Sequence, residues 1–314
     1  MTSNANKPSK VAIVGAGFVG ATAAYALMIE GLATEIALID INRQRAEGEA
    51  LDLKHGLQFV NTTKITFGSN YGLCKGADIV IVCAGLHQGK GETRLDLVEK
   101  NARIFREIIP KIAKNSPDCI LLIVKNPVDI LTYLALKYSG FPKRRVIGSG
   151  TLLDTARLRY WLSHRFKVSP QHVHAFVLGE HGDSEFPVWS TANISGKPLG
   201  EFPEYSAKAL QQIFRKTKES AYEVIAKKGA TYYAIGLAIT QVVKAILTDR
   251  NDVFPVSTLV SNYYGVNNVC LSIPCVINRK GIERTIELTL NKQEQALLRK
   301  SAKTLSQYIR KVKK

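Results

Sequence analysis

A glycine-rich turn near the start of the chain constrains the fold more than any other feature. Residues 11–14 form a short apolar run with branched side chains, typical of a buried strand, and this run leads into Gly15-Ala-Gly-Phe-Val-Gly20. A helical pattern follows and ends near Gly31. A strand, a tight turn and a helix in this order begin a βαβ unit, so we expect parallel strands covered by helices.

Strand-like and helical segments alternate along the first 150 residues. This alternation predicts an α/β fold in which residues 1–150 form a doubly wound parallel sheet of the Rossmann type, with residues 1–10 as a flexible arm. The expected strands are 35–40, 78–85 and 120–124, and the expected helices follow a cap at Asn42, span 97–112 and begin at Pro127.

The pattern changes after residue 150. Residues 151–314 are expected to form a mixed α+β domain that packs closely against the first one, with a cleft between the two. The helical segments are 151–166, 203–248 and a closing helix, and the strand-like segments are 172–178, 269–277 and 281–290, of which the last two look antiparallel.

Length and composition exclude several classes of protein. The chain has 314 residues, of which 46% are hydrophobic, and this suits one large or two moderate domains. No apolar run approaches the roughly 20 residues that span a bilayer, and the polar N-terminus lacks a signal-peptide core, so we expect a cytoplasmic protein without a membrane partner. The five cysteines include no CxxC pair, which argues against a zinc site and a disulfide framework.

The net charge of +17 raises the question of an acidic partner. Basic residues are spread along the chain, with a local excess from Arg299 to Lys314, where apolar residues recur at helical spacing. An amphipathic helix with a solvated basic face explains this segment, so we expect no nucleic-acid partner. The alternative is a basic nucleic-acid-binding protein with a vestigial dinucleotide fold, which would be retained on DNA in a salt-dependent way that NADH does not affect.

The glycines of the first turn predict a dinucleotide site. Gly15, Gly17 and Gly20 allow a tight turn, a close approach to a diphosphate and close packing of helix on strand. Asp40 lies 20 residues beyond Gly20, at the end of the second strand, where it would accept hydrogen bonds from a ribose and repel a 2′-phosphate. This favours NAD over NADP, although Arg43 and Arg45 lie nearby. The alternative is a glycine turn without a ligand.

A histidine between glycines is the strongest candidate for acid/base chemistry. His181 lies in Gly179-Glu-His-Gly-Asp183, and Glu185 follows closely. Imidazole titrates near neutrality, so it can take and give a proton at cellular pH. A metal ligand and a solvated surface residue are the alternatives.

Three further stretches carry polar residues that could act with this histidine. A glycine-rich loop from Gly85 to Arg94 follows a strand, at the edge where ligands bind in open parallel sheets, and could close over a ligand. Asn126 follows the next strand, and Asp154 and Arg157 lie one helical turn apart. Each has a plainer interpretation. Arg94 could be a solvated loop charge, Asn126 a helix cap, and Asp154 with Arg157 a surface ion pair.

Taken together, the motifs resemble those of the NAD-dependent L-lactate dehydrogenases of the lactate/malate dehydrogenase superfamily, from Val11 to about Lys303. They occur in the family's order and spacing. The motifs are Gly15-Ala-Gly-Phe-Val-Gly20, Gly91-Glu-Thr-Arg-Leu-Asp96, Asn126-Pro-Val-Asp129, Asp154-Thr-Ala-Arg157, Gly179-Glu-His-Gly-Asp183 and Lys228-Gly-Ala-Thr-Tyr-Tyr233.

The resemblance implies a role for each motif residue in the reduction of pyruvate to L-lactate with NADH. His181 gives and takes the proton of the substrate oxygen, Asp154 holds its ring, and no metal takes part. The implied substrate-binding residues are Arg157 for the carboxylate, Arg94 for the carbonyl, Asn126, Thr231 and Gln88. The implied cofactor-binding residues are Gly15, Gly17, Phe18, Val19, Gly20, Asp40, Ala84, Gly85, Asn126 and Ile235.

The position of Gln88 separates the close relatives within this superfamily. Lactate dehydrogenases typically carry glutamine there and malate dehydrogenases carry arginine, so the resemblance implies pyruvate over oxaloacetate. A malate dehydrogenase or a broad L-2-hydroxy acid dehydrogenase is the alternative. Lys125 departs from the family, which has a small Ser or Thr before Asn-Pro, and Leu86 and His87 are also unusual, so substrate breadth and cofactor affinity stay open.

Arg159 and His174 match positions that bind fructose 1,6-bisphosphate across a subunit interface in many bacterial relatives. Two cations from each of two subunits would form a phosphate clamp. The alternative is that both are ordinary surface or interface residues. The family also implies a homotetramer.

Overall fold

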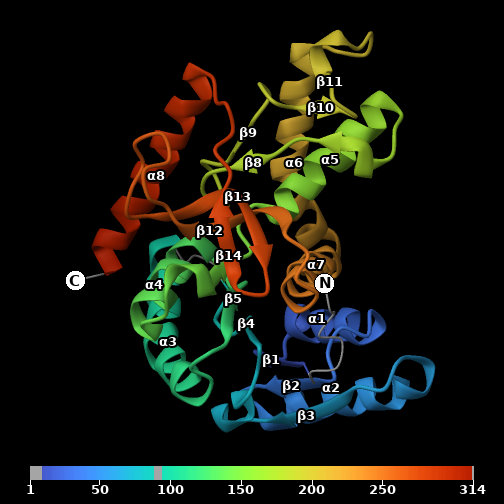
Figure 1. Cartoon of the computed structure of the whole chain (residues 1–314), viewed down its shortest axis with the longest axis vertical. Helices are drawn as coiled ribbons and strands as arrows, with labels where there is room; N and C mark the ends of the chain where they lie inside the picture. The colour runs from blue at the N-terminus through green and yellow to red at the C-terminus, as the bar shows by residue number, and fades with distance from the viewer. Residues whose placement is uncertain (1–8, 88–93, 313–314) are drawn as a thin grey trace.

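A continuous nine-stranded sheet is the centre of the fold (Figure 1). The computed structural model describes residues 9–87 and 94–312. Six parallel strands lie in the order β3-β2-β1-β4-β5-β6, which is the doubly wound order of dinucleotide-binding folds. These strands are β1 Lys10–Val14, β2 Glu35–Ile39, β3 Lys64–Gly68, β4 Ile79–Val82, β5 Ile120–Ile123 and β6 Val146–Gly148.

Helices connect the parallel strands and cover both faces of the sheet. Figure 1 shows α3 and α4 on one side and α1 with α7 on the other. The helices of this half are α1 Phe18–Ile29, α2 Arg43–His55, α3 Arg94–Asn115 and α4 Val128–Ser139. The expected doubly wound architecture is therefore confirmed, and Asn42 caps α2 by accepting a hydrogen bond from the amide of Arg45.

The sheet does not stop at residue 150. Strand β12 (Asp252–Leu259) pairs with β6 through Ser257 and Gly148, and β13 (Cys270–Asn278) and β14 (Gly281–Thr285) extend the sheet in antiparallel register. One apolar core runs from β1 to α8 (Lys292–Val312) through both halves of the chain. Both halves therefore share one sheet and one main core.

A second, smaller core holds together the lobe above the sheet in Figure 1. Leu158 and Leu162 of α5 (Leu152–Phe166) are fully buried there, against Val173. The other elements of the chain are α6 Ala207–Lys228, α7 Tyr233–Leu247, β7 Val173–His174, β8 Val177–Leu178, β9 Phe186–Pro187, β10 Asn193–Ile194 and β11 Lys197–Pro198. The catalytic candidates lie where this lobe meets the sheet.

Four details differ from the sequence-based expectation. The strand expected at 281–290 ends at Thr285. The strand expected at 172–178 is two short strands, β7 and β8, which belong to different small sheets. Pro127 is the residue that caps α4 and not its first residue. Strands β3, β6 and β12 were not anticipated.

Across residues 9–87 and 94–312, no helix combines the length and the apolar content that a transmembrane span needs.

Candidate active site

Backbone packing explains why the first turn requires glycine. Gly15 has a φ of +103°, and a Cβ there would lie 2.6 Å from the amide nitrogen of Ala84. A Cβ on Gly20 would lie 2.0 Å from the carbonyl oxygen of Gly15. Gly17 has φ −78° and caps α1 without a side chain, so the first amides of the helix remain open to an anion.

The other cofactor candidates lie along the same edge of the sheet. Asp40 follows β2, and its two carboxylate oxygens accept the amides of Ala16 (2.8 Å) and Asn42 (2.9 Å). This places a negative charge directly beside the glycine turn. Ala84 and Gly85 follow β4 and Asn126 follows β5, whereas Ile235 lies on α7, which packs on α1.

The side chains around the turn differ in exposure. Phe18 is exposed and stacks on Tyr232, with ring centroids 5.2 Å apart, while Val19 and Ile235 pack against the main core. The carboxyl ends of parallel strands, a helix N-terminus and an acid at the end of β2 fit a dinucleotide with a diphosphate and an unsubstituted ribose.

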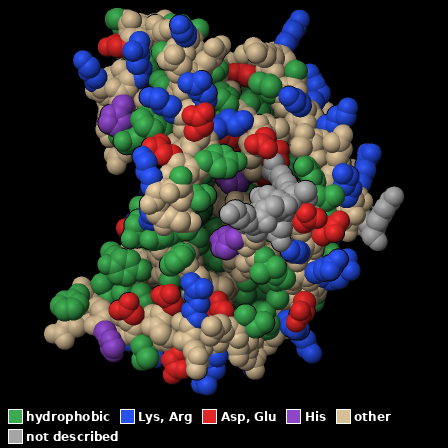
Figure 2. Space-filling view, turned by 180° about the vertical axis from the view of Figure 1, so that it is seen from behind, with side chains coloured by type: hydrophobic (Ala, Val, Ile, Leu, Met, Phe, Trp, Pro, Cys, Tyr) green, Lys and Arg blue, Asp and Glu red, His purple; other side chains and the backbone are tan. Residues whose placement is uncertain are grey.

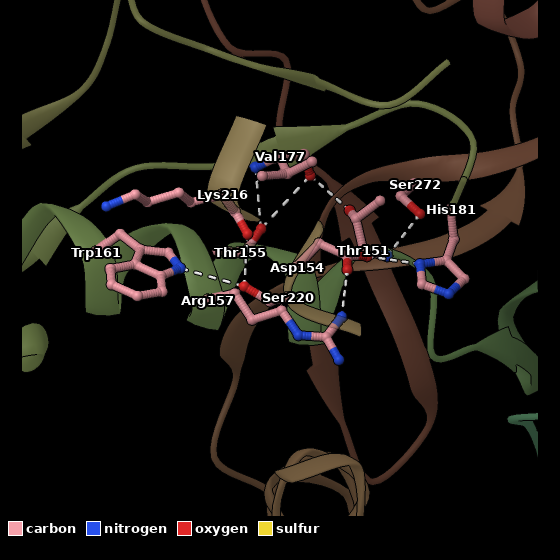
Figure 3. Close-up of polar contacts among 10 residues, drawn as sticks. All are labelled: Thr151, Asp154, Thr155, Arg157, Trp161, Val177, His181, Lys216, Ser220 and Ser272. Carbon is pink, nitrogen blue, oxygen red and sulfur yellow. Dashed lines mark hydrogen bonds and ion pairs between the residues drawn. The ribbon is translucent and has the colours of Figure 1, made fainter. Parts of the chain in front are cut away.

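An ionic cluster of Asp154, Arg157, His181 and Glu185 lies at the lobe boundary (Figure 3 shows the first three). Nδ1 of His181 lies 2.6 Å from Oδ2 of Asp154, and Nη1 of Arg157 lies 2.9 Å from Oδ1. The side chains of Asp154, Arg157 and His181 are 5%, 14% and 26% exposed. The Asp154–Arg157 pair is therefore not a surface ion pair.

Hydrogen bonds from α5 explain how residues 27 positions apart come together. The hydroxyl of Thr151 donates to the carbonyl of Val177 (2.5 Å), and the hydroxyl of Thr155 accepts the Val177 amide (2.9 Å). Both contacts fix the start of the 177–185 stretch on the helix that carries Asp154, as Figure 3 shows.

The backbone on either side of His181 is also fixed. Oδ2 of Asp129 accepts the amide of His181 (2.8 Å), and Ser301 of α8 accepts the amide of Glu180 (2.6 Å). Gly179 has a φ of +92°, and a Cβ there would lie 2.8 Å from Oγ of Ser301. The sequence placed Asp129 in a motif but gave it no role, and the structure shows that it positions the histidine backbone.

The electrostatics of the cluster favour a protonated histidine. Burial alone would lower the pKa of His181, but the charge and hydrogen bond of Asp154 outweigh it and raise this pKa to about 9. Burial opposes ionisation of Asp154, yet His181 and Arg157 keep the pKa of its carboxyl below its usual value. His181 therefore carries a proton at neutral pH and can donate it.

Glu185 is a member of the cluster to which the sequence assigned no role. It is buried, and one of its oxygens lies within 4.8 Å of the ligand atoms of Asp154 and His181. Burial and the charge of Asp154 raise the pKa of Glu185 well above its usual value. The cluster also holds two cationic side chains, His181 and Arg157, on the single carboxylate of Asp154, which suits an anionic substrate.

The spacing of Asp154, His181 and Glu185 would also suit a cation. Two features oppose this interpretation. The oxygens of Asp154 already face His181 and Arg157, and the guanidinium of Arg157, 2.9 Å from Oδ1, would repel a metal ion. We therefore interpret the cluster as a proton-transfer group.

The remaining candidates lie at various places around the cluster. Asn126 is exposed at the end of β5, and the structure excludes it as a helix cap, because Pro127 has that position. Thr231 is half-buried in the connection between α6 and α7. Helix α3 begins at Arg94, whose side chain lies outside the described part, as does Gln88.

The two phosphate-clamp candidates are close to each other. Nε of Arg159 donates to the carbonyl of Ala175 (3.0 Å), and its guanidinium lies 5.3 Å from the centroid of Phe176. His174 is exposed on β7. Arg159 is thus partly engaged within its own chain.

Figure 2 shows a face of the molecule that contains a hollow, and histidine side chains lie beside this hollow. Lysine and arginine side chains are scattered over this face and do not gather into a single stripe, as a nucleic-acid groove would require.

A diphosphate-binding turn and an imidazole–carboxylate pair at one sheet edge define the class of a nicotinamide-dependent dehydrogenase. Comparisons with known proteins agree. The lactate/malate dehydrogenase NAD-binding domain matches residues 9–148, and the lactate/malate dehydrogenase α/β C-terminal domain matches residues 151–314. The chain belongs to the lactate/malate dehydrogenase family, and its cofactor is NAD.

Relatives with this architecture include both curated proteins and solved structures. An L-lactate dehydrogenase of Clostridium botulinum is 50% identical over 302 residues, 95% of each chain, and one of Acetivibrio thermocellus is 50% identical over 306 residues, 96% of each. A lactate dehydrogenase from a Medee basin deep-sea metagenome superposes with a TM-score of 0.95 at 42% identity, covering 98% of this chain and 100% of that one. The minor L-lactate dehydrogenase of Enterococcus mundtii gives 0.94 at 41%, with coverage of 97% and 98%.

Proposed function

We propose that this enzyme is an L-lactate dehydrogenase, which reversibly reduces pyruvate to L-lactate. The observation that carries the proposal is the contact of 2.6 Å between Nδ1 of His181 and Asp154, with Arg157 on the other carboxylate oxygen. The family and the names of the 50% identical relatives support it.

The proposed chemistry follows from the charges of the cluster. When NADH is bound, its nicotinamide supplies the hydride. His181 keeps its Nδ1 on Asp154, so its Nε2–H is the proton donor for the substrate oxygen, on which negative charge develops. In a closed, water-poor site this stabilisation is larger than in solvent. Oxidation of lactate uses the neutral ring as the base.

We assign the substrate carboxylate to Arg157. One nitrogen of its guanidinium binds Asp154, and Figure 3 shows the other terminal nitrogen turned away from that carboxylate. The fork geometry of arginine then allows parallel hydrogen bonds to a carboxylate. Asn126, Thr231 and Arg94 complete the proposed site, with Asn126 and Arg94 at the substrate oxygen.

Gln88 decides the substrate in this proposal. A neutral side chain leaves the second carboxylate of oxaloacetate unpaired, which is costly in a desolvated pocket. Oxidation of NADH measured side by side with pyruvate and oxaloacetate should give a higher kcat/KM for pyruvate. A preference for oxaloacetate would instead support the alternative, a malate dehydrogenase or a broad L-2-hydroxy acid dehydrogenase.

The assembly, location and regulation are further parts of the proposal. The family resemblance supports a cytoplasmic homotetramer in which Arg159 and His174 bind fructose 1,6-bisphosphate. Pyruvate titrations with and without this bisphosphate test the regulatory role. An unchanged half-saturation concentration would contradict it.

A further inference from the structure

Lys125 is a buried cation at the edge of the sheet where the cofactor binds. It follows β5, directly before Asn126, and is only 8% exposed. Its aliphatic stem lies along Gly85, because a Cβ on that glycine would be 2.8 Å from Cγ of Lys125 and 3.0 Å from Cε. The two residues therefore pack on each other, and the lysine fills the space that a side chain at 85 would need.

Among the residues that the structure describes, no carboxylate forms an ion pair with Lys125. Within residues 9–87 and 94–312, no acceptor forms a hydrogen bond or ion pair with its ammonium. Cys83 faces it but stays a neutral thiol, since burial raises its pKa to about 12. Burial also lowers the pKa of Lys125 to about 8. An unpaired buried charge is costly, and such groups are concentrated at functional sites.

The ammonium of Lys125 is not sealed inside the protein. In the described part of the chain, the only side-chain nitrogen and oxygen atoms that are both sealed and without a partner belong to Asp129 and Ser257. The unpartnered ammonium of Lys125 therefore keeps contact with solvent. His87 faces the same space, because the charge of Lys125 is the main cause that lowers the pKa of its ring.

Lys125 and the glycine turn both pack against one short backbone segment, residues 84–85. Gly15 packs against Ala84, and Lys125 packs against Gly85. Asn101 of α3 holds this arrangement in place, because its side-chain amide binds both the amide of Leu86 (2.7 Å) and the carbonyl of Asn126 (2.9 Å). A dinucleotide whose diphosphate lies at the turn would continue past residues 84–85 towards Asn126 and so towards Lys125.

We propose that Lys125 is a further cofactor-binding residue, whose ammonium binds the dinucleotide's phosphate on the nicotinamide side while the N-terminus of α1 binds the other side. This role rests only on the binding of NAD and is independent of the substrate. It gives the unpaired cation an anionic partner and explains why a charge is kept in a buried position.

Equilibrium binding to the whole enzyme tests the proposal without any turnover. NADH, ADP-ribose and AMP are titrated calorimetrically into the wild type, Lys125→Met and the control Lys114→Met, whose lysine is exposed near the end of α3. For Lys125→Met, NADH and ADP-ribose should bind about 5- to 10-fold more weakly, as expected for one lost charge-assisted contact. AMP, which lacks the second phosphate, should be unaffected.

Three results would overturn the proposal. If Lys125→Met binds ADP-ribose with unchanged affinity, the ammonium does not bind the phosphate. A loss of affinity for NADH alone would lead to the same conclusion. An equal loss for AMP would indicate general damage to the site. If Lys125→Met does not fold, Lys125→Ser, which carries a small side chain typical of the family, must give the same pattern.

A pH series provides a second readout. The ammonium is present below a pKa of about 8 and lost above it, so affinity of the wild type for ADP-ribose should fall between pH 7 and pH 9. Lys125→Met should show no such fall. Among the described residues, the other titratable groups facing Lys125 are Cys83 and His87. If a His87→Gln variant retains the fall, the fall is assigned to the lysine. A fall that persists in Lys125→Met would contradict the role.

Discussion

The cofactor turn and the ionic cluster act through different chemical groups. The turn, residues 15–20, offers backbone amides and depends on missing side chains, because a Cβ at Gly15 or Gly20 would meet backbone atoms. The cluster of Asp154, Arg157, His181 and Glu185 depends on buried charges that set each other's protonation. Substitutions in the turn should therefore affect cofactor binding or folding, whereas substitutions in the cluster should affect proton transfer.

The sharpest contrast is expected from His181→Asn. Loss of the proton donor should lower kcat for pyruvate reduction by about 10³-fold, within the range of general acid–base catalysis. The affinity for NADH, measured by fluorescence titration, should stay within a factor of about two, because the turn is untouched. The control is His172→Asn, an exposed histidine. Retained turnover in His181→Asn would contradict the assignment of the cluster.

Asp154→Asn should weaken catalysis and move its pH dependence. In the wild type, reduction needs protonated His181 and should decline as pH rises through about 9. Without this carboxylate, burial is opposed only by the charges of Glu185 and Asp129, so the pKa of His181 falls and the decline should move to lower pH.

The rate of Asp154→Asn at neutral pH should drop by about 10²-fold, and pH profiles of kcat measure both effects. An unshifted profile would show that Asp154 does not control His181.

The glycines of the turn offer a matched pair of substitutions. Gly15→Ala places a residue at φ +103° against Ala84 and should lower the free energy of unfolding by about 1–3 kcal/mol. A Cβ on Gly17 meets only the side chain of Arg45, at 3.8 Å or beyond, so Gly17→Ala should fold normally. It should still bind NADH about 10-fold more weakly, because the diphosphate must approach the backbone there.

Denaturant unfolding and NADH titration of both variants separate the two glycine roles. Tight NADH binding by Gly17→Ala would place the cofactor elsewhere.

The smallest effect is expected from a surface ion pair. Glu107 and Lys111 of α3 are 2.7 Å apart but 70% and 50% exposed, unlike Asp154 and Arg157. Glu107→Gln should leave the midpoint of denaturant unfolding and catalysis unchanged, because solvent screens an exposed ion pair. A lower midpoint would show that exposure does not separate the two kinds of ion pair.

The sequence predicted the parallel half of the fold well because strong local signals mark it. The glycine turn and the apolar runs of β1, β2, β4 and β5 all lie where local pattern and burial agree. Strand β12 was missed although β13, its neighbour in the sheet, was predicted, and each of the two strands contains a proline, Pro255 and Pro274. Strand β3 is as long as β1 but is not a continuous apolar run, and only two of its five residues are buried. Strand β6 has only 3 residues, so little periodicity marks it.

The candidate site was predictable only in part. The pairing of His181 with Asp154 came from the family resemblance, and no local spacing could provide it. The burial of Glu185 and the contact of Asp129 with the His181 backbone depend on how α4, α5 and α8 meet, which a single sequence does not encode locally. The burial of Lys125 against Gly85 likewise depends on tertiary packing.

The protonation of His181 is the central claim, and NMR titration of ring-labelled histidines measures it directly. The signal is assigned by its loss in His181→Asn. The pKa of His181 should be about 9, because the charge and hydrogen bond of Asp154 outweigh the cost of burial. A value near the ordinary 6.5 or below would contradict the account, since the ring would then be neutral at cellular pH and could not supply the proton.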